Sequence, residues 1–325
     1  MLPASQSTSC RRGRLECHSF ATFFPAVWKG IRMLTVRAPA TSANLGSGFD
    51  VFGVALGRPA DVVRVERAPE TAITVTGAGS QYIPEDPAKN TVGAVADALD
   101  APARIRIDKG VRPSSGLGSS ASSAAAAAVA LNELYDRGLS RRELVPIAAE
   151  GEALVSGEAH ADNVAPSLLG GFTVVTDDGV TQIDASIPVV ACLPDMAVST
   201  RDAREVVPER AHMSDVVDTV GSAATLTIGM ARNDPELVGR GMEDEIVTPE
   251  RSALIDGYDR VREAAFEAGA TGVTVSGAGP GVLATCYRSD RRAVAAAMVE
   301  AFDAVGVDSR AYQTVVGDGA RLYTE

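Results

Sequence analysis

The sequence predicts an α+β protein with two domains. Its 325 residues exceed the roughly 100–200 residues that are usual for one domain. Hydrophobic residues make up 46% of the chain and charged residues 22%, so a sizeable core can be buried and wholesale disorder is excluded. Segments with strand-like and helix-like patterns occur together in both halves of the chain, which is typical of α+β domains built from two layers.

The first half combines short strands with helices. Alternating or β-branched segments predict strands at 34–38, 61–67, 71–77, 103–107 and 171–176. Small and apolar residues predict a short helix at 90–99, and a further helix is expected near 143–155. A glycine- and serine-rich loop at 113–123 leads into an alanine-rich helix that ends near Leu134, because alanine is the best helix former. Residues 160–166 are expected to form a loop.

The second half begins with an apolar strand at 189–193. Further strands are expected at 271–275, 282–287 and 309–315, and helices at 214–232, 235–242, 250–268 and 290–305. Residues 177–188 are polar and contain a proline, which favours a connection between domains. We therefore expect one domain over 33–186 and another over 187–325.

The first 32 residues differ in composition from the rest. They contain Cys10, Cys17, the single tryptophan Trp28, and five basic residues against one acidic residue. Met33 directly precedes the first convincing strand. We interpret residues 1–32 as an upstream extension that results from a misplaced start codon, and we expect it to be disordered.

The charge, hydropathy and cysteine content of the chain limit the partners and the compartment that can be expected for it. The net charge is −12, which argues against a nucleic-acid partner because phosphate contacts need a basic surface. No apolar run reaches the roughly 18–20 residues of a membrane span, so no membrane partner is expected. After Met33 only Cys192 and Cys286 remain, which fits a reduced cytoplasm. Only three of the 30 basic residues are lysine, so either a halophilic source or a GC-rich genome explains the composition.

The strongest local motif is the glycine loop. Gly116-Leu117-Gly118-Ser119-Ser120 leads into a helix, an arrangement in which backbone N–H groups and the helix N-terminus can face an anion. The serine hydroxyls can bind phosphate or Mg²⁺. The loop has neither the Gly-Lys-Ser/Thr of a Walker A motif nor the spacing of a dinucleotide-binding fingerprint. A flexible turn capped by serine would show the same pattern.

Two other segments carry polar groups that suit a binding site. In the segment 39–50, Asn44 and Asp50 lie six residues apart across two glycines and can converge on one ligand, although a turn between strands would use the same residues. Downstream of Glu152, the run His160-Ala-Asp162-Asn163-Val-Ala-Pro166 places a histidine beside an acid and an amide. Such a histidine is more often structural than catalytic when it stands alone.

Together these segments resemble the homoserine kinases of the GHMP kinase superfamily. The resemblance rests on four motifs in the family's order, which begin at Pro39, Gly116, His160 and Ser276. The segment from His160 distinguishes homoserine kinases from mevalonate, galactose and shikimate kinases. The resemblance implies an N-terminal domain similar to ribosomal protein S5 domain 2, a ferredoxin-like C-terminal domain, and an active site between them. The implied reaction is ATP-dependent phosphorylation of L-homoserine to O-phospho-L-homoserine in threonine biosynthesis.

The resemblance also implies residues for ATP and Mg²⁺. The loop that wraps the ATP phosphates corresponds to Pro113, Ser114, Ser115, Gly116, Leu117, Gly118, Ser119 and Ser120. Asn90 and Lys109 match positions near the adenine pocket and the loop, although Lys109 could equally be a solvated turn residue. Ser120 and Glu152 match the positions that hold Mg²⁺, which prefers hard oxygen ligands. A glutamate alone on a helix is otherwise usually solvated.

The implied substrate site needs groups for an ammonium, a carboxylate and a reacting hydroxyl. Residues that match the family's substrate pocket are Asn44, Asp50, His160, Asp162, Arg204, Arg251 and Gly277, with arginine suited to bind a carboxylate. Asn163 and Thr200 match positions beside the reacting hydroxyl, and no obligatory catalytic base is expected. The chain departs from the family pattern at Arg112, where isoleucine or methionine is usual, and Arg112 is not expected to be catalytic.

Two other functions remain open from the sequence. Another small-molecule kinase of the superfamily would act on shikimate, mevalonate or pantoate, which lack the ammonium that Asp50 and Asp162 would bind. A non-catalytic ATP- or amino-acid-binding protein on the same fold would be free to lose Ser120 and Glu152. Family members are often homodimers, so the resemblance also allows a second copy of the chain as partner.

Overall fold

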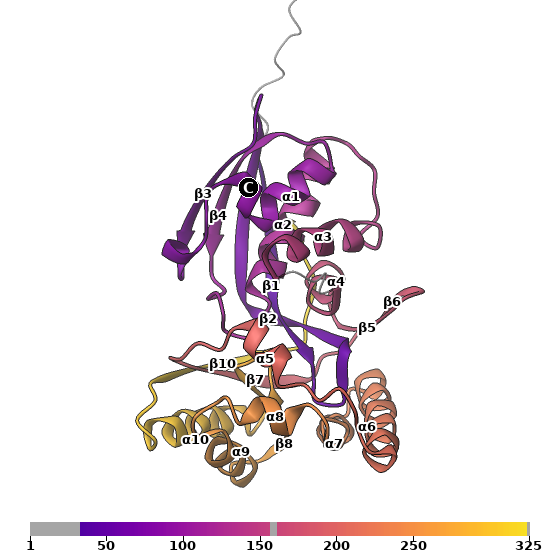
Figure 1. The fold of residues 1–325 in the computed structure, drawn as a ribbon, viewed down its shortest axis with the longest axis vertical. Helices are drawn as coiled ribbons and strands as arrows, with labels where there is room; N and C mark the ends of the chain where they lie inside the picture. The colour runs from indigo at the N-terminus through magenta and orange to yellow at the C-terminus, as the bar shows by residue number, and fades with distance from the viewer. Residues whose placement is uncertain (1–32, 157–160, 324–325) are drawn as a thin grey trace, which may run out of the picture. The chain divides into compact units, whose positions relative to one another are not determined.

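The computed structural model describes residues 33–156 and 161–323, which form two β-sheets with helices packed against them (Figure 1). Within these ranges the larger sheet has seven strands and the smaller sheet has four. Because sheets and helices are mixed in both halves of the chain, the predicted α+β class is confirmed. The predicted extension at 1–32 lies outside the described residues.

The larger sheet is built on a long antiparallel hairpin of β1 and β2. Strands β4 and β3 continue the sheet from β2, β11 pairs with β1, and β5 and β6 extend the sheet from another part of β2. The strands are β1 (Leu34–Asn44), β2 (Gly48–Arg67), β3 (Ala72–Gly77), β4 (Ala103–Lys109), β5 (Phe172–Thr176), β6 (Gly179–Ile183) and β11 (Arg321–Tyr323). In β4 the isoleucines are buried and the arginines exposed, as the alternation of ARIRI predicts.

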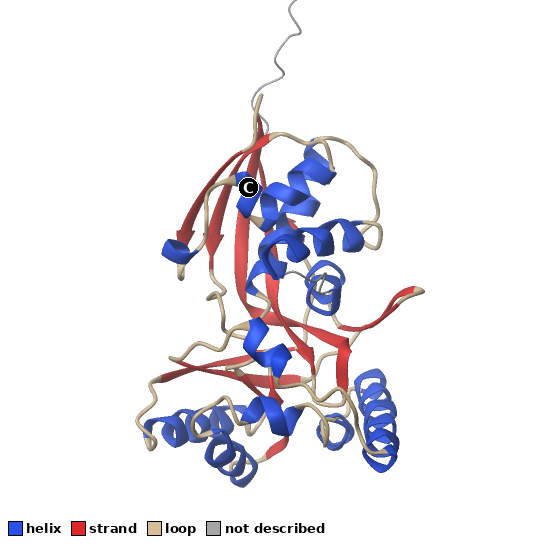
Figure 2. Ribbon diagram, in the orientation of Figure 1, coloured by secondary structure: helices blue, strands red, loops and turns tan. Residues whose placement is uncertain are grey.

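Helices α1 to α4 lie against one face of this sheet, where Figure 2 shows them in blue beside the red strands. They are α1 (Thr91–Ala98), α2 (Ser119–Leu134), α3 (Leu144–Ser156) and α4 (Ala161–Leu169), and the short 3₁₀ helices η1 (Ser80–Tyr82) and η2 (Pro87–Lys89) precede them. Helix α2 packs on β1 and β2, and its run Ala124–Ala128 is fully buried. Small alanine side chains let the helix backbone lie close to the sheet.

The smaller sheet has the strand order β10-β7-β9-β8, with all neighbours antiparallel. Its strands are β7 (Pro188–Pro194), β8 (Ala270–Val275), β9 (Val282–Cys286) and β10 (Ser309–Val315). Helices connect β7 to β8 and β9 to β10: α5 (Thr200–Glu205), α6 (Met213–Arg232), α7 (Pro235–Gly241), α8 (Thr248–Ser252), α9 (Tyr258–Glu267) and α10 (Arg291–Asp303). This β-α-β-β-α-β order is ferredoxin-like, so that prediction is confirmed.

A hydrophobic core joins the two halves of the chain. The rings of Phe52 and Phe172 meet edge to face at 4.9 Å, and they belong to one cluster with Leu117, Val189 and Leu226. The cluster thus combines β2 and β5 of the larger sheet with the glycine loop, β7 and α6. The division of the chain into 33–186 and 187–325 stays a prediction.

Some expected elements differ in the structure. The expected strands at 34–38 and 61–67 are longer in the structure: β1 continues to Asn44 and β2 begins at Gly48, so the segment 39–50 contains a short turn between two strands. The expected helix over 250–268 is wrong as one element, because Gly257, with a φ angle of 86°, separates α8 from α9. The polar connection at 177–188 contains β6.

The loop expected at 160–166 is wrong for the described residues 161–166, which belong to α4. This helix contains Pro166, which has no N–H to donate to the carbonyl oxygen of Asp162 four residues earlier. That carbonyl oxygen lies against Gly53, where an added Cβ would approach it to 1.9 Å. Packing on β2 therefore stabilises a helix that Pro166 by itself would disfavour.

Among the described residues, no helix is both long and apolar enough to cross a bilayer.

Candidate active site

A cavity of about 1160 Å³ brings together most of the residues that the sequence motifs indicate. Of the residues expected at ATP and Mg²⁺, its wall contains Asn90, Lys109, Pro113, Ser114, Ser115, Gly116, Gly118, Ser119, Ser120 and Glu152. Of those expected at the substrate, it contains Asn44, Asp50, Asp162, Asn163, Thr200, Arg204, Arg251 and Gly277. Segments far apart in the sequence, from both halves of the chain, therefore share one cleft.

One expected residue among those that the structure describes, Leu117, is not part of this wall. The side chain of Leu117 is fully buried in the hydrophobic core between the sheets, and its carbonyl oxygen accepts a hydrogen bond from the backbone N–H of Thr41. Leu117 therefore anchors the loop rather than lining the cavity. His160 lies outside the described residues.

The glycine loop turns sharply before helix α2. Ser114, Gly116 and Gly118 have φ angles of 53°, 75° and 58°, and Gly118 directly precedes the first turn of α2. Backbone N–H groups in the first turn of a helix have no partners within the helix and carry partial positive charge. The beginning of α2 therefore presents the cavity with an end that favours a phosphate.

The loop lies against the glycine-containing segment between β8 and β9. A Cβ atom on Gly116 would come within 2.3 Å of the carbonyl oxygen of Ser276, so only glycine fits here without a shift. The Ser276 hydroxyl lies 2.7 Å from the carbonyl oxygen of Gly116 and 2.8 Å from the hydroxyl of Ser42. The backbone N–H of Gly277 donates to the carbonyl oxygen of Ala43. Three of the motifs thus meet at this point.

Ser120 and Glu152 form a pair of oxygen donors beside the loop. The Ser120 hydroxyl donates a hydrogen bond of 2.6 Å to Oε2 of Glu152, whose side chain is buried. Burial raises the pKa of Glu152 to about 7, although the Ser120 hydrogen bond and the positive charge of Lys109 oppose this rise. A carboxylate held this far from water has a strong preference for a nearby cation.

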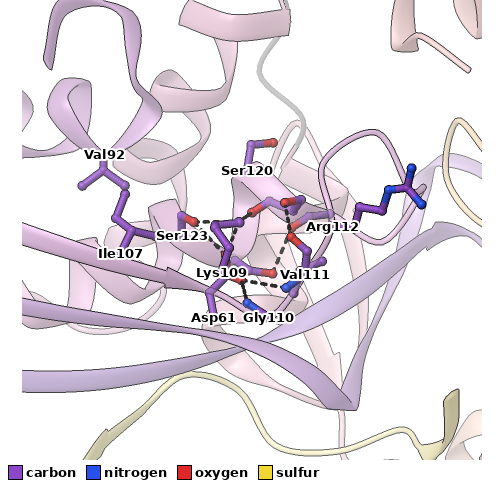
Figure 3. Close-up of polar contacts among 12 residues, drawn as sticks. Asp61, Val92, Ile107, Lys109, Gly110, Val111, Arg112, Ser120 and Ser123 are labelled. Atoms are coloured by element: carbon purple, nitrogen blue, oxygen red, sulfur yellow. Dashed lines mark hydrogen bonds and ion pairs between the residues drawn. The ribbon is translucent and has the colours of Figure 1, made fainter. Parts of the chain in front are cut away.

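Lys109 lies beneath the loop, at the end of β4, and forms an ion pair with Asp61 of β2 (Figure 3). Both side chains are almost fully buried. The alternative of a solvated turn lysine is therefore wrong. Asp61 was not expected at the site from the sequence; the available signal was an acid in the apolar strand segment Ala60–Val63.

The first motif places Asn44 and Asp50 at the turn of the β1–β2 hairpin. Both have positive φ angles, of 71° and 58°. The Asn44 side chain accepts a hydrogen bond from the backbone N–H of Asp50 and donates one to the carbonyl oxygen of Gly277. Asn44 therefore fixes the position of Asp50 and connects the hairpin to the segment between β8 and β9.

Two arginines lie beside Asp50. Nη1 of Arg204 is 2.5 Å from Oδ2 of Asp50. Arg251 is buried and donates to the carbonyl oxygens of Ala203 and Gly277. Burial lowers the pKa of Arg251, and Asp50 opposes that shift. Both guanidinium groups also lie over the ring of Phe49, at 5.2 Å and 4.9 Å from its centre, which eases their mutual repulsion.

The start of α4 contributes the buried Asp162 and its neighbour Asn163. The Thr41 hydroxyl donates a hydrogen bond of 2.8 Å to Oδ1 of Asn163, and Nδ2 of Asn163 lies 3.4 Å from Oδ1 of Asp162. Thr41 is another residue that was not expected at the site. Thr200 reaches the cavity from the first turn of α5.

Arg112 turns away from this arrangement. Its guanidinium pairs with Asp195 at 2.6 Å, and both side chains are about half exposed. Arg112, at the position that departs from the family pattern, is not among the residues that line the cavity.

The cleft combines a helix N-terminus that favours phosphate, a buried carboxylate–hydroxyl pair, and a cluster of acids and arginines. These features define a class of protein that binds a phosphorylated ligand together with a charged small molecule. Comparisons with known proteins agree with this class. The model of the GHMP kinases N terminal domain matches residues 88–171, and that of the GHMP kinases C terminal region matches residues 226–304.

Individual relatives narrow the class. Homoserine kinases of Natronomonas pharaonis and Haloarcula marismortui are each 74% identical over 291 residues, which cover 90% of this chain and all of theirs. The crystal structure of homoserine kinase from Cytophaga hutchinsonii superposes with a TM-score of 0.83 at 36% identity, over 90% of this chain and 97% of that one. The chain therefore belongs to the homoserine kinase family of the GHMP kinases.

The close contact at Gly118 gives a test of the loop geometry. A Cβ atom there would lie 2.0 Å from Oγ1 of Thr41 and 2.8 Å from Oδ1 of Asn163. We expect Gly118→Ala to lower the affinity for ADP at least about tenfold, because the loop must shift, and to lower the free energy of unfolding by at least about 1–2 kcal/mol. Calorimetric titration with ADP and chemical denaturation measure the two effects.

Gly138 provides the matched control. Its φ angle of 71° also favours glycine, but an added Cβ would meet nothing within 4 Å. Gly138→Ala should therefore show the loss of stability from backbone strain, about 1 kcal/mol, with unchanged ADP affinity. Equal ADP affinity in both variants would contradict the role given to the Gly118 contact.

Proposed function

We propose that this chain transfers the γ-phosphoryl group of ATP to the side-chain hydroxyl of L-homoserine, giving ADP and O-phospho-L-homoserine in threonine biosynthesis. The observation that carries the proposal is one cavity that joins the glycine loop to two carboxylates and two arginines. The names of relatives that are 74% identical over 90% of this chain support the same reaction.

ATP binds in this proposal with its phosphates on the loop from Pro113 to Ser120 and at the beginning of α2. Asn90 lines the same cavity, as do Tyr82 and Ile83. The Asn90 side chain accepts from the backbone N–H of Val92 and donates to the carbonyl oxygen of Pro84, which stabilises the start of α1. The aromatic ring of Tyr82 and the apolar side chain of Ile83 suit a purine base.

Mg²⁺ fits Ser120 and Glu152. Both supply hard oxygen atoms, only 2.6 Å apart. In proteins Mg²⁺ commonly takes one or two side chains and completes its shell with phosphate oxygens and water. The ion, when bound, neutralises charge on the transferring phosphoryl group. Ser120 and Glu152 would hold it at the start of α2.

The acceptor is a zwitterion with one hydroxyl. We assign its ammonium to the carboxylates of Asp50 and Asp162 and its carboxylate to Arg204 and Arg251, because these pairings are hydrogen-bonded as well as charged. Asn44 and Gly277 shape the same part of the cavity. We also keep His160 in the pocket as a prediction, although it lies outside the described residues.

The transfer step needs positioning more than covalent chemistry from the protein. We place the reacting hydroxyl beside Asn163 and Thr200. The Asn163 amide has its oxygen toward Thr41 and its nitrogen toward Asp162, since a carboxylate can only accept. The hydroxyl proton passes to the phosphoryl oxygen or to solvent as the new O–P bond forms, so no obligatory base is assigned.

The reaction is tested by ADP release from Mg²⁺-ATP in high KCl, with L-homoserine, shikimate, mevalonate, pantoate or no acceptor. Turnover with L-homoserine alone is the expected result. Turnover with another acceptor would keep the ATP site and overturn the substrate. Folded protein that binds ATP but turns over none of them would instead favour a non-catalytic binding protein.

Asp162→Asn separates binding from base catalysis. If Asp162 binds the substrate ammonium, the variant should raise KM for L-homoserine about 10–100-fold, the usual loss for one charged hydrogen bond. Its kcat and its KM for ATP should change much less. A fall of kcat by several orders of magnitude at unchanged KM would show that Asp162 is a base instead.

Glu152→Gln tests the metal site. The amide keeps the shape of the side chain but is a poorer ligand for Mg²⁺, so the Mg²⁺ concentration for half-maximal activity should rise about tenfold or more. KM for L-homoserine at saturating Mg²⁺ should stay near the wild-type value. A wild-type Mg²⁺ dependence in this variant would remove Glu152 from the site.

We propose that the protein works in the cytoplasm at high salt. The net charge is −12, and the two curated relatives described above come from haloarchaea. Cys192 and Cys286 are both free thiols, as in a reducing compartment. Salt reduces the repulsion among the acidic side chains, because the Debye length falls from about 10 Å at 0.1 M to about 3 Å at 1 M.

The expected consequence is a melting temperature that rises steadily from 0.1 M to molar KCl. Over this range of salt the screening length falls about threefold, which weakens the repulsion among the acidic side chains. Thermal unfolding followed by circular dichroism measures it, with a mesophilic protein of near-zero net charge as control. A melting temperature that is indifferent to KCl would contradict adaptation to salt.

We also propose that the protein forms a homodimer through helix α6. One side of this helix exposes an apolar stripe of Met213, Val217, Val220, Ala224 and Ile228. Asp215 and Asp218 lie near the beginning of the helix and Arg232 at its end. Two antiparallel copies would therefore cover the apolar stripe and place opposite charges side by side.

Light scattering after size exclusion tests the dimer. Wild-type protein is expected to be dimeric in high KCl, and Val217→Asp to be monomeric, because burial of the new carboxylate is unfavourable. Ser214→Asp adds the same charge to the same helix outside the stripe and should stay dimeric. A monomeric wild type, or a dimeric Val217→Asp, would contradict this interface.

A further inference from the structure

We propose that Lys109 acts on the nucleotide without contacting it: it neutralises Asp61 beneath the glycine loop, and the two are positioning residues for the loop. The inference rests on the proposed binding of ATP at this loop. It assigns a function to Asp61, which none of the sequence motifs contains, and it changes the expected function of Lys109 from direct contact to indirect support.

Asp61 is the centre of a buried polar cluster (Figure 3). Its side chain is 0% exposed. Oδ1 accepts hydrogen bonds of 3.0 Å from the backbone N–H groups of Gly110 and Val111, and Oδ2 accepts one of 2.7 Å from the Ser123 hydroxyl. The same oxygen pairs with the ammonium of Lys109. One carboxylate therefore connects the residues that precede the loop to the first turns of α2.

The ammonium of Lys109 has its donors engaged within this cluster. Besides Asp61, it donates to the carbonyl oxygen of Ser119 at 2.6 Å and to the Ser123 hydroxyl at 2.9 Å. A lysine ammonium has three N–H donors, and three acceptors occupy them here. A direct bond to a phosphate would require the loss of one of these contacts. Figure 3 shows Lys109, Asp61 and Ser123 pointing toward one another.

Charge explains why the pair matters to a bound phosphate. Asp61 supplies acceptors for the backbone that begins the loop, but its negative charge would oppose an anion above it. Lys109 cancels that charge. Without the ammonium, an uncompensated carboxylate within about 10 Å of the phosphates would weaken their binding about tenfold or more at an effective dielectric constant of about 20.

The paired variants distinguish this function from direct contact. Lys109→Met removes the positive charge and leaves the carboxylate, so both models expect weaker ADP binding. Asp61→Asn/Lys109→Met removes both charges, and the amide oxygen still accepts from Gly110 and Val111. If Lys109 acts through Asp61, the double variant recovers affinity. If Lys109 contacts the phosphates, the double variant still lacks that contact and stays more than about tenfold weaker than wild type.

The experiment is calorimetric titration of the full chain with ADP, in excess Mg²⁺ and high KCl, after circular dichroism has shown that each variant is folded. We expect Lys109→Met to bind ADP about tenfold or more weakly, and the double variant to bind within about tenfold of wild type and more tightly than Lys109→Met. KM for L-homoserine should be unchanged in the double variant, because the proposed homoserine pocket is formed by other segments of the chain than those of Asp61 and Lys109.

The chain offers a matched control on the same two strands. Arg104 of β4 pairs with Glu66 of β2, but Arg104 is exposed and the pair lies away from the cavity. Glu66→Gln/Arg104→Met removes one charge of each sign, as the test variant does, and should leave ADP affinity unchanged.

Two failures can be told apart. If wild-type protein does not bind ADP, the proposed ATP site itself is wrong. If wild type binds ADP but the double variant is no tighter than Lys109→Met, only the function given to Asp61 and Lys109 is overturned. Should Lys109→Met not fold, the double variant decides alone: affinity within about tenfold of wild type supports the inference, and weaker binding overturns it.

Discussion

The cleft depends on two glycines at which segments of the chain meet too closely for another side chain. A Cβ added to Gly116 would be 2.3 Å from the carbonyl oxygen of Ser276, and one added to Gly118 would be 2.0 Å from the hydroxyl oxygen of Thr41. These contacts join the glycine loop, the β1–β2 hairpin and the segment between β8 and β9. Because each segment supports the other two, the loop can keep its left-handed turns while Leu117 stays buried in the core beneath it.

Much of the fold was predictable because its patterns are local. The alternation in β4, the alanine-rich run of α2 and the strand and helix order of the second half each follow from neighbouring residues. Where the sequence reasoning was wrong at α4, a distant contact decided the structure. Helix α4 contains Pro166, and it is held by close packing of the Asp162 carbonyl against Gly53, a residue more than 100 positions earlier.

The residues of the candidate site likewise divide into those that the sequence identified and those that only the structure revealed. Residues such as Asn44, Glu152 and Arg251 were identifiable because their segments resemble the motifs of a known family, and the structure brings them to one cavity. Asp61 was marked only as an acid in an apolar strand, and Thr41 only by its place in the segment 39–50; neither feature by itself indicates a function. Their importance comes only from what lies opposite them: the Lys109 ammonium in one case and the Asn163 amide in the other. Contacts between residues on distant strands and helices form only in the folded chain, so neighbouring residues in the sequence do not reveal them.

The ion pair between Asp50 and Arg204 has a consequence for the choice of acceptor. The two side chains come from the β1–β2 hairpin and from α5, and each neutralises the other across the cleft. A zwitterion can separate them and offer each a new partner of opposite sign, so one internal ion pair is exchanged for two with the ligand. A molecule with a single charge compensates one side only. In the proposed binding mode, a free amino acid therefore compensates both side chains, whereas an uncharged or singly charged alcohol compensates at most one of them.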